Sequence, residues 1–317
     1  MALDLRRLRY VHAVAQNGSL TRAAEVLGVA QPALSHHLAE LERHFGARLF
    51  HRTPRGMVPT DVGRILAAQA ASILRSVEDA EAAVRNGVAT LAGAVTVGLL
   101  NTVALNLAVP LIRCCLARYP NIRLALREGT SQTLADAMQK QEIDLSVNLS
   151  EASDGSARLL ATERLILASP ARPGEPGGDI GDIGLREALA CPLVLPPREH
   201  VIRKLVEWAA LQHDIRLDVR YELVGGWTLK SLVAEGLAHT IIGRAAITPE
   251  DLRGRIAIRR IVSPALERRL VLVQSPIRAT APAVQAVTGL LRELVVRKAG
   301  EGTWTAAAFP EPPVQGA

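Results

Sequence analysis

The 317-residue chain is poor in cysteine, in aromatic side chains and in long apolar runs. Its three cysteines cannot build a disulfide framework and suit a reducing compartment. No run of about 18 uncharged apolar residues is present, and arginines interrupt the start of the chain, so we expect neither a membrane span nor a secretory signal. With three residues each of Phe, Trp and Tyr, the cores must be aliphatic. We therefore expect a soluble cytoplasmic protein without a membrane partner.

The sequence also lacks the motifs of common enzyme classes. It contains no GxSxG or HExxH motif, no Walker phosphate loop and no GxGxxG after an expected strand. Cys114 and Cys115 lie mid-helix among Leu and Ile, which favours packing over redox sensing, because a sensor thiol needs exposure and a lowered pKa. No metal-ligand cluster is expected around His213 and His239. We expect no enzyme activity, no cofactor and no metal site.

Positive charge is concentrated at the start of the chain. Residues 1–60 hold eight Arg against four acidic residues, and five of the eight His, whereas the rest of the chain is nearly balanced. A basic unit of domain size on a nearly neutral body favours an anionic partner such as nucleic acid, with an ordinary solvated face as the alternative. The length itself predicts two or three domains.

The basic segment has the pattern of a helix-turn-helix. Asn17-Gly18 ends a first amphipathic helix, Ser19 can cap a second, and a third begins at Gln31-Pro32 after a turn that contains Gly28. Polar residues on the first turns of such a third helix can reach base edges in the major groove. The following LFHRTPRGMVPT alternates around a Pro-Arg-Gly turn, which predicts a hairpin wing. The alternative is an ordinary three-helix bundle with a loop.

A long helix and an alternating α/β region follow. Thr60-Asp61 can cap a helix that keeps helical spacing to Leu91, spanning ~45 Å at 1.5 Å per residue. Its narrow seam of Ala, Val and Ile predicts a pairing helix, the alternative being a helix packed along its own body. Residues 93–300 alternate strand and helix, which predicts largely parallel sheets flanked by helices. The Gly- and Pro-rich segment 171–184 is expected to be a loop or the edge of a subdomain.

Two stretches carry a family resemblance. GSLTRAAEVLGVAQPALSHHLAELERHFGARLFHRTPRGMVPTDVG resembles the winged helix-turn-helix of LysR-type transcriptional regulators, without gaps over residues 5–63, and LARYPNIRLALREGTSQTLADAMQKQEIDLSV resembles the first lobe of their effector domain. The details are closest to the nitrogen-assimilation-control branch. The resemblance implies an α/β protein with an N-terminal winged helix-turn-helix, a long linker helix and a two-lobed, periplasmic-binding-protein-like effector domain.

The domain limits follow from this comparison. We expect the DNA-binding domain at 4–61, with the helix-turn-helix at about 20–39, the linker and dimerisation helix at 60–91, and the effector domain at 93–300. Lobe I is expected at 93–163 and 268–300, and lobe II at 164–267. The tail 301–317 is expected to be disordered because it is rich in Pro and lies at the terminus.

The resemblance also assigns DNA contacts. They lie at the start of the scaffold helix, on the recognition helix and on the wing: Thr21, Arg22, Gln31, Pro32, Ser35, His36, Arg52, Thr53 and Arg55. Ala30 replaces a common Ser and loses an N-cap of roughly 1 kcal/mol. His36 and His37 stand where Arg or Gln is common, so the preferred base sequence should differ. Histidines here could make DNA affinity pH-dependent, although a solvent-facing histidine usually changes nothing measurable.

Effector contacts are expected where strand ends from both lobes meet. They are Asn101, Thr102, Gly129, Thr130, Ser131 and Asn148 in lobe I, and Arg198, His200, Val201, Arg203, Gly226 and Trp227 in lobe II. Arg203 can clamp an anion, or equally pair with Glu199 or Glu207 on its own helix. Trp227 can stack on a ligand, although core filling is favoured.

Together these patterns predict a sequence-specific transcriptional regulator. Its expected partners are double-stranded promoter DNA with an inverted repeat, a small effector, expected to be an organic anion, a second copy in a homodimer or homotetramer, and RNA polymerase. It would be cytoplasmic and associated with the nucleoid when bound to DNA. The alternative is a cytosolic small-molecule binding protein whose N-terminal module serves assembly and binds DNA incidentally.

Overall fold

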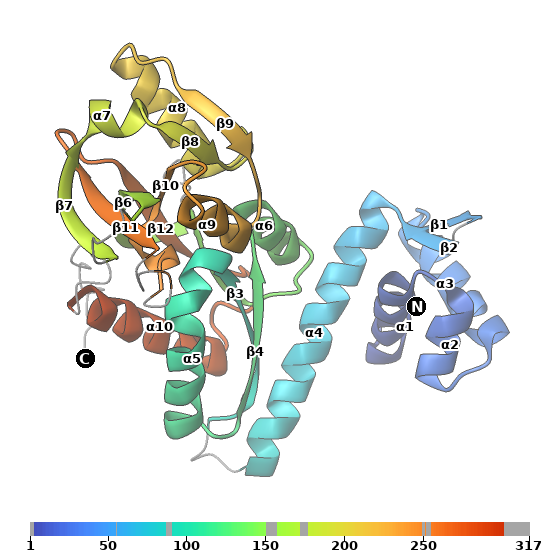
Figure 1. Cartoon of the computed structure of the whole chain (residues 1–317). Helices are drawn as coiled ribbons and strands as arrows, with labels where there is room; N and C mark the ends of the chain where they lie inside the picture. The colour runs from blue at the N-terminus through green and yellow to red at the C-terminus, as the bar shows by residue number, and fades with distance from the viewer. Residues whose placement is uncertain are drawn as a thin grey trace.

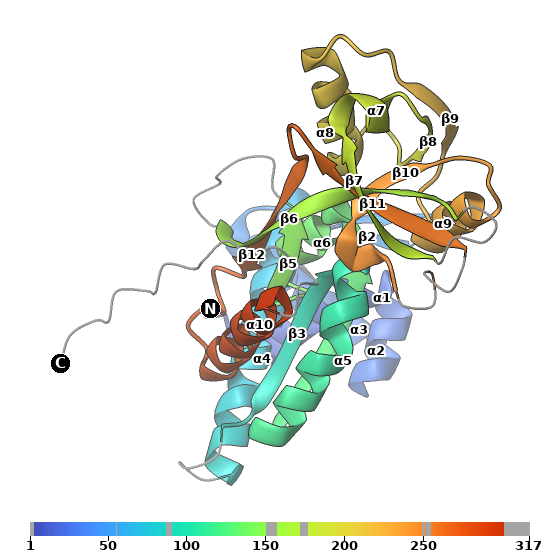
Figure 2. The same cartoon turned by 60° about the vertical axis from the view of Figure 1, so that its left-hand side comes forward.

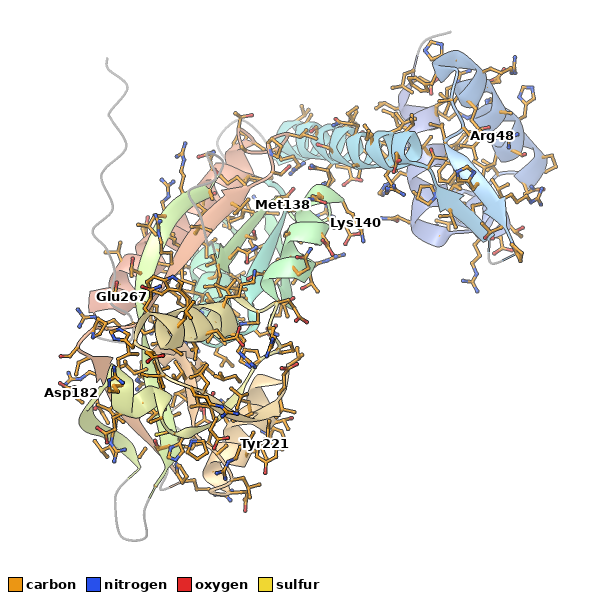
Figure 3. The ribbon with its side chains drawn as sticks, turned by 90° about the horizontal axis from the view of Figure 1, so that it is seen from above. Arg48, Met138, Lys140, Asp182, Tyr221 and Glu267 are labelled. Atoms are coloured by element: carbon orange, nitrogen blue, oxygen red, sulfur yellow. The ribbon has the colours of Figure 1, made fainter. Side chains whose placement is uncertain are left out.

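The computed structural model describes residues 3–54, 56–86, 91–149, 157–171, 177–248, 251 and 255–300. A small head and a larger two-lobed body lie on opposite sides of one long helix (Figure 1). Seen along another axis, the head, marked by Arg48, stands clear of the body, in which Asp182, Tyr221 and Glu267 lie (Figure 3). No helix within the described residues is both long and apolar enough to cross a bilayer.

The head is a three-helix unit with a hairpin wing, as predicted. Its elements are α1 (Leu5–Asn17), α2 (Leu20–Leu27), α3 (Gln31–Phe45), β1 (Phe50–Thr53) and β2 (Gly56–Pro59). The Asp4 and Ser19 side chains accept backbone N–H groups at the starts of α1 and α2. Gly18 and Gly28 end the same two helices at φ +59° and +65°, a left-handed conformation that glycine adopts without strain. Sharp helix ends of this kind set the angle between α2 and α3.

The long helix is α4 (Asp61–Asn86), which spans ~39 Å at 1.5 Å per residue. Thr60 Oγ1 accepts the Gly63 N–H at 3.0 Å and so caps its first turn. Leu66 and Ala67 pack on the head core, and the Arg75 guanidinium donates to the Gln141 carbonyl of the body. The predicted helix continued to 91, but residues 87–90 lie outside the described part of the chain.

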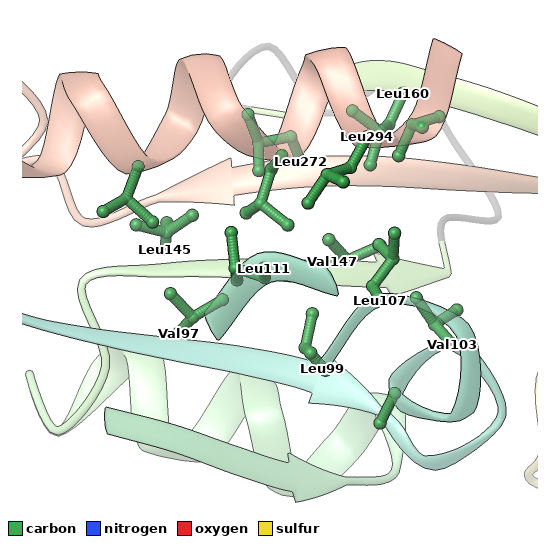
Figure 4. Close-up of a cluster of buried hydrophobic side chains, with 14 of the residues drawn as sticks. Val97, Leu99, Val103, Leu107, Leu111, Leu145, Val147, Leu160, Leu272 and Leu294 are labelled. Carbon is green, nitrogen blue, oxygen red and sulfur yellow. The ribbon is translucent and has the colours of Figure 1, made fainter. Parts of the chain in front are cut away.

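Lobe I is an α/β unit with an aliphatic core. It contains β3 (Gly93–Leu100), α5 (Asn101–Arg118), β4 (Ile122–Gly129), α6 (Ser131–Gln139), β5 (Leu145–Leu149), β12 (Glu267–Gln274) and α10 (Pro282–Gly300). Strand β3 pairs in parallel with β4 and β5, and β12 adds antiparallel to β5. Figure 4 shows Val97, Leu111, Leu272 and Leu294 filling the space between sheet and helices.

Lobe II is built around a second set of strands. It contains β7 (Gly178–Gly184), α7 (Leu185–Leu189), β8 (Pro192–Leu195), α8 (Val201–Gln212), β9 (Asp218–Glu222), α9 (Gly226–Ala234), β10 (Thr240–Gly243), the 3-10 turn η1 (Arg244–Ala246) and β11 (Ile256–Val262). Strand β11 pairs in parallel with β7, and β8 pairs in parallel with β9. Two buried aliphatic clusters lie in this lobe.

One strand joins the two lobes. Strand β6 (Ala157–Pro170) pairs with β12 along its first part and with β10 and β11 along its second part, in each case antiparallel. Figure 2 shows β6 and β12 running through the junction between lobes. The lobes thus share one curled eight-stranded sheet, and β8 and β9 form a separate two-stranded sheet in lobe II.

One expectation about the body was wrong, and a second was right in one of its two alternatives. The sheet is parallel only at its outer parts; its centre is antiparallel, because β6 runs antiparallel to β12 in lobe I and to β10 and β11 in lobe II. Segment 171–184, expected to be a loop or the edge of a subdomain, contains β7, which is the last strand at one edge of the sheet. This Gly- and Asp-rich strand is held by its pairing with β11 and by an ion pair of Asp182 with Arg260 at 2.7 Å. Residues 172–176 and the predicted tail 301–317 lie outside the described residues.

Candidate DNA-binding surface and effector cleft

Helix α3 presents its first turns to solvent on the side of the head away from α4. Helix α1 lies between α4 and the α2–α3 pair (Figure 1). Leu34, Leu38 and Leu41 of α3 are buried in the head core, which fixes the orientation of the helix. On the opposite faces Pro32 and His36 are exposed, and Gln31 and Ser35 are half-buried. As predicted, Ala30 supplies no side-chain cap.

The other predicted DNA contacts belong to α2, which precedes α3 in the chain, and to the wing, which follows it. Thr21 and Arg22 are exposed on the first turn of α2, and Arg52 is exposed on β1. Thr53 Oγ1 donates to the Gly56 carbonyl at 3.1 Å and closes the wing. Arg55 lies outside the described residues.

A residue that sequence reasoning did not single out holds the wing against α3. Glu42 Oε1 accepts the N–H groups of Leu49 at 2.8 Å and Phe50 at 3.3 Å. From the other side, the Met57 N–H donates to the Gly18 carbonyl at 2.7 Å. The wing is therefore tied to α3 and to the α1–α2 turn, which fixes the backbone of β1, including Arg52, relative to the recognition helix.

A cavity of about 100 Å³ lies between the lobes. Six of the predicted effector residues line it: Asn101, Thr102, Gly129, Thr130, His200 and Gly226. Aliphatic side chains of both lobes make most of the remaining wall, among them Leu100, Ile202, Leu223 and Ile241. Asn101 and Gly226 begin α5 and α9, and neither helix has a side-chain cap. Among the described residues, no N-cap side chain accepts the first-turn N–H groups of these two helices at the cavity.

The other six predicted effector residues do not line this cavity: Ser131, Asn148, Arg198, Val201, Arg203 and Trp227. Arg203 is buried and donates from Nε to Glu207 Oε1 at 2.8 Å and from Nη1 to the Pro196 carbonyl at 3.3 Å. The ion-pair alternative with Glu207 is therefore the one that the structure shows. The Asn148 amide is used internally, donating to the Ser131 carbonyl at 3.3 Å.

Two further expectations concern the surroundings of Trp227 and of Cys115. Trp227 is 79% exposed, so the favoured role in core filling is wrong. It follows Gly226 directly and stands in solvent because α9 begins at the surface of lobe II. Cys115 is buried in the core of lobe I, and burial raises the pKa of its thiol, which agrees with the packing role.

The charged side chain that does reach the cavity is Arg268, which sequence reasoning missed. Its Nε donates to Glu163 Oε2 at 2.6 Å, and its Nη2 contacts Thr102 Oγ1 at 3.3 Å. Glu163 Oε1 also accepts the Ala245 N–H at 2.8 Å, and both charged side chains are 1% exposed. The sequence carried no clear signal for this pair, because β6 and β12 each contain further charged residues, and only the structure shows that Glu163 and Arg268 are the buried ones.

His200 stands beside this pair at the start of α8. Its Nδ1 accepts the Ile202 N–H at 3.2 Å, which caps the helix. Burial, and next the positive charge of Arg268, lower the pKa of the His200 imidazole below its ordinary value. The side chain is therefore neutral at pH 7, and the positive charge of Arg268 that acts on it is balanced by Glu163.

Two protein families match the chain. The bacterial regulatory helix-turn-helix protein family of LysR type matches residues 5–64, and the LysR substrate binding domain matches residues 89–295. The chain belongs to the LysR family. It is a DNA-binding transcriptional regulator with an effector-binding domain, and the alternative of a binding protein with incidental DNA contact is not favoured, because the helix-turn-helix match covers the whole head.

Similar LysR-type proteins support this assignment. The nitrogen assimilation regulatory protein nac of Klebsiella aerogenes is 31% identical over 299 residues, covering 93% of this chain and 96% of that protein. The nac protein of Escherichia coli (strain K12) is 31% identical over 300 residues, covering 92% and 95%. These relatives are regulators rather than enzymes, in agreement with the expectation from motifs.

Solved LysR-type structures share the fold. A full-length OxyR variant from Pseudomonas aeruginosa superimposes with a TM-score of 0.74 at 22% identity, covering 98% of this chain and 100% of that one. Full-length CbnR in complex with its target DNA gives a TM-score of 0.61 at 22% identity, covering 93% and 99%. The arrangement of head, linker helix and two-lobed domain is thus that of full-length LysR-type proteins.

Proposed function

We propose that α3 enters the major groove of promoter DNA. Gln31, Pro32, Ser35 and His36 would meet base edges, and the start of α2 and the wing would hold the backbone through Thr21, Arg22, Arg52, Thr53 and Arg55. The observation that carries the proposal is the division of α3 into a buried leucine face and an open polar face on its first two turns. The similarity to CbnR, solved with its target DNA, supports it.

We propose that the chain acts as a homodimer, assembling further into a tetramer. Large apolar side chains are exposed along α4, among them Ile65 at 65% and Val84 at 84%. A second exposed stripe follows α5 at helical spacing: Leu105, Val109, Ile112 and Leu116. Pairing of these faces would bury them and hold two heads at a set spacing, which predicts an inverted-repeat DNA site. At such a promoter site we place the protein on the nucleoid, with RNA polymerase as a further partner.

We propose that a compact organic anion with an apolar body binds between the lobes. The aliphatic walls suit the body of such a ligand, and the N–H groups that begin α5 and α9 suit its charged group, next to Arg268 and Thr102. Since both lobes contribute to the wall, binding would favour a closed arrangement of the lobes over an open one.

DNA recognition is tested by selecting from a random DNA pool with purified full-length protein at near-physiological salt. We expect enrichment of an interrupted inverted repeat, relaxed by Gln31→Ala and Ser35→Ala but not by Gln132→Ala, an exposed glutamine of the body. Affinity should fall steeply with salt, as several phosphate contacts require. A folded protein that enriches no motif would refute the proposal.

Effector binding is tested by thermal shift across a panel of small carboxylates and uncharged analogues. We expect stabilisation by a subset of the carboxylates that is lost in Thr102→Val and kept in Trp227→Ala, because Thr102 lines the cavity and Trp227 does not. Stabilisation by the uncharged analogues alone would overturn the anionic class, and equal loss in both variants would place the ligand elsewhere.

A further inference from the structure

Three metal-binding side chains gather on α3. One ligand atom each from His36, His37 and Glu40 lies within 4.8 Å of the other two. His36 is exposed, and the other two side chains are half-buried. The expected absence of a metal site rested on His213 and His239 and did not take this group into account. Glu40 lies one helical turn beyond the two histidines, so its carboxylate can share an ion with them.

The spacing is close to what a tetrahedral ion requires. Zinc bonds of about 2.0–2.1 Å to nitrogen and oxygen place ligand atoms roughly 3.4 Å apart. His37 Nδ1 and Glu40 Oε2 are already 3.3 Å apart. His36 has to approach by little more than about 1 Å, and its exposed side chain is free to rotate. Water would take the fourth position, as at other sites with three protein ligands.

The surroundings hold two of the ligands in place. The ring of His37 packs against Tyr10 with centroids 5.4 Å apart. The buried Arg7 guanidinium contacts Glu40 Oε2 at 3.2 Å, so it fixes the carboxylate as the outer partners of metal ligands commonly do. Desolvation raises the pKa of Glu40, but the hydrogen bond with His37 and the nearby positive charges outweigh it and hold the pKa below its ordinary value. Glu40 is therefore an ionised ligand at neutral pH.

We propose that His36, His37 and Glu40 bind one divalent transition-metal ion of the zinc class, and that this ion weakens DNA binding. Two imidazoles and one carboxylate suit zinc and its neighbours, whereas magnesium and calcium prefer oxygen ligands. The weakening rests on the proposed function, because His36 is one of the side chains assigned to the bases. An ion that binds the His36 ring removes that ring from its contacts with DNA. By linkage, bound DNA must lower the affinity for the ion by the same factor as the ion lowers the affinity for DNA.

The site itself is tested without DNA. The untagged full-length chain is titrated with Co²⁺, whose visible absorption reports tetrahedral nitrogen and oxygen ligands, and then with Zn²⁺ as a competitor. We expect one ion per chain, with affinity reduced at least about tenfold in His36→Ala, His37→Ala and Glu40→Gln. His44→Ala is the matched control, because His44 is an exposed histidine of α3 whose ring contacts Phe45 instead. Absence of a cobalt signal, or equal binding by the His37→Ala variant, would overturn the site.

The effect on DNA is measured on the selected motif with and without Zn²⁺. We expect Zn²⁺ to weaken binding by the wild-type chain and by His44→Ala, and to leave His37→Ala unchanged, because that variant keeps His36 for DNA but lacks a ligand. Unchanged affinity of the wild type, or equal weakening of His37→Ala, would overturn the coupling. If no DNA motif is selected at all, the proposed function fails, while the cobalt titration still decides the site.

Discussion

Two neighbouring ion pairs on the same two strands should differ sharply in their contribution to stability. Glu163 of β6 lies opposite Arg268 of β12, and the next residues, Arg164 and Glu267, lie opposite each other with the charges exchanged. Because side chains alternate across a strand, the first pair points inward and the second outward. The inner side chains are 1% exposed, whereas those of the outer pair are 57% and 44% exposed.

The perturbation is Glu163→Gln, which keeps the shape of the side chain and removes its charge. Arg268 would then carry an uncompensated charge in the protein interior. Breaking a buried pair in this way costs about 3–5 kcal/mol, and we expect the lower end, because the amide can still bond to Ala245 or Arg268. The matched change Glu267→Gln should cost ~0–1 kcal/mol, because water already screens the outer pair.

Urea unfolding at pH 7.5, followed by far-ultraviolet circular dichroism, measures both changes as shifts of the midpoint. A loss of about 3 kcal/mol corresponds to roughly a hundredfold change in the unfolding equilibrium and is well resolved. The reasoning is refuted if Glu163→Gln loses less than about 1 kcal/mol, or if both variants lose the same. Adding Arg268→Met to Glu163→Gln should recover part of the loss, because it removes the uncompensated charge.

Three further predictions concern the head, the helices and pH. Ala30→Ser should raise the free energy of unfolding by about 1 kcal/mol, measured by thermal unfolding, because α3 has no side-chain cap, and an unchanged midpoint would show that the cap does not form. Gly63→Ala should lower the free energy of unfolding by about 1–3 kcal/mol or more, because its Cβ would lie 1.8 Å from the Leu49 carbonyl oxygen. Gly289→Ala should instead raise it by roughly 0.5–1 kcal/mol, because a Cβ at this position of α10 would meet nothing within 4 Å. Burial lowers the pKa values of His12, His200 and His239, so the unfolded chain binds more protons and stability should fall as pH drops below about 6.5; a melting temperature that stays constant from pH 7.5 to 5.5 would contradict this.

The head was predictable from sequence because its signals are local. Caps, turn glycines and leucine spacing act within a few residues, so the helices and the wing could be placed without tertiary information. Strand β7 was missed for the opposite reason. The Gly-Asp repeat of β7 has low strand propensity, and only its pairing with β11, about 80 residues away, makes it a strand.

The cleft shows the same division between local and distant information. Six lining residues follow strand ends, and a strand end can be read from sequence. Which arginine reaches the cavity, Arg203 or Arg268, depends on the pairing of β6 with β12, and this pairing is not visible in the local sequence. Arg203 had an acceptor one helical turn away in Glu207, whereas Glu163 and Arg268 are 105 positions apart and meet only because β6 and β12 pair.

The contacts of α4 limit how an effector signal can reach the heads. Its Arg75 donates to Gln141, whose Oε1 accepts the Ser275 hydroxyl at 2.6 Å, and α4 also packs against β3, so these contacts are all to lobe I. The cavity lies at the junction of the lobes, and the proposed closure would move lobe II relative to lobe I. Within one chain α4 and its head therefore move with lobe I. We expect effector binding to change the spacing of two heads through contacts that lobe II makes with another copy, so substitutions of exposed lobe II residues should uncouple effector from DNA while leaving both affinities intact.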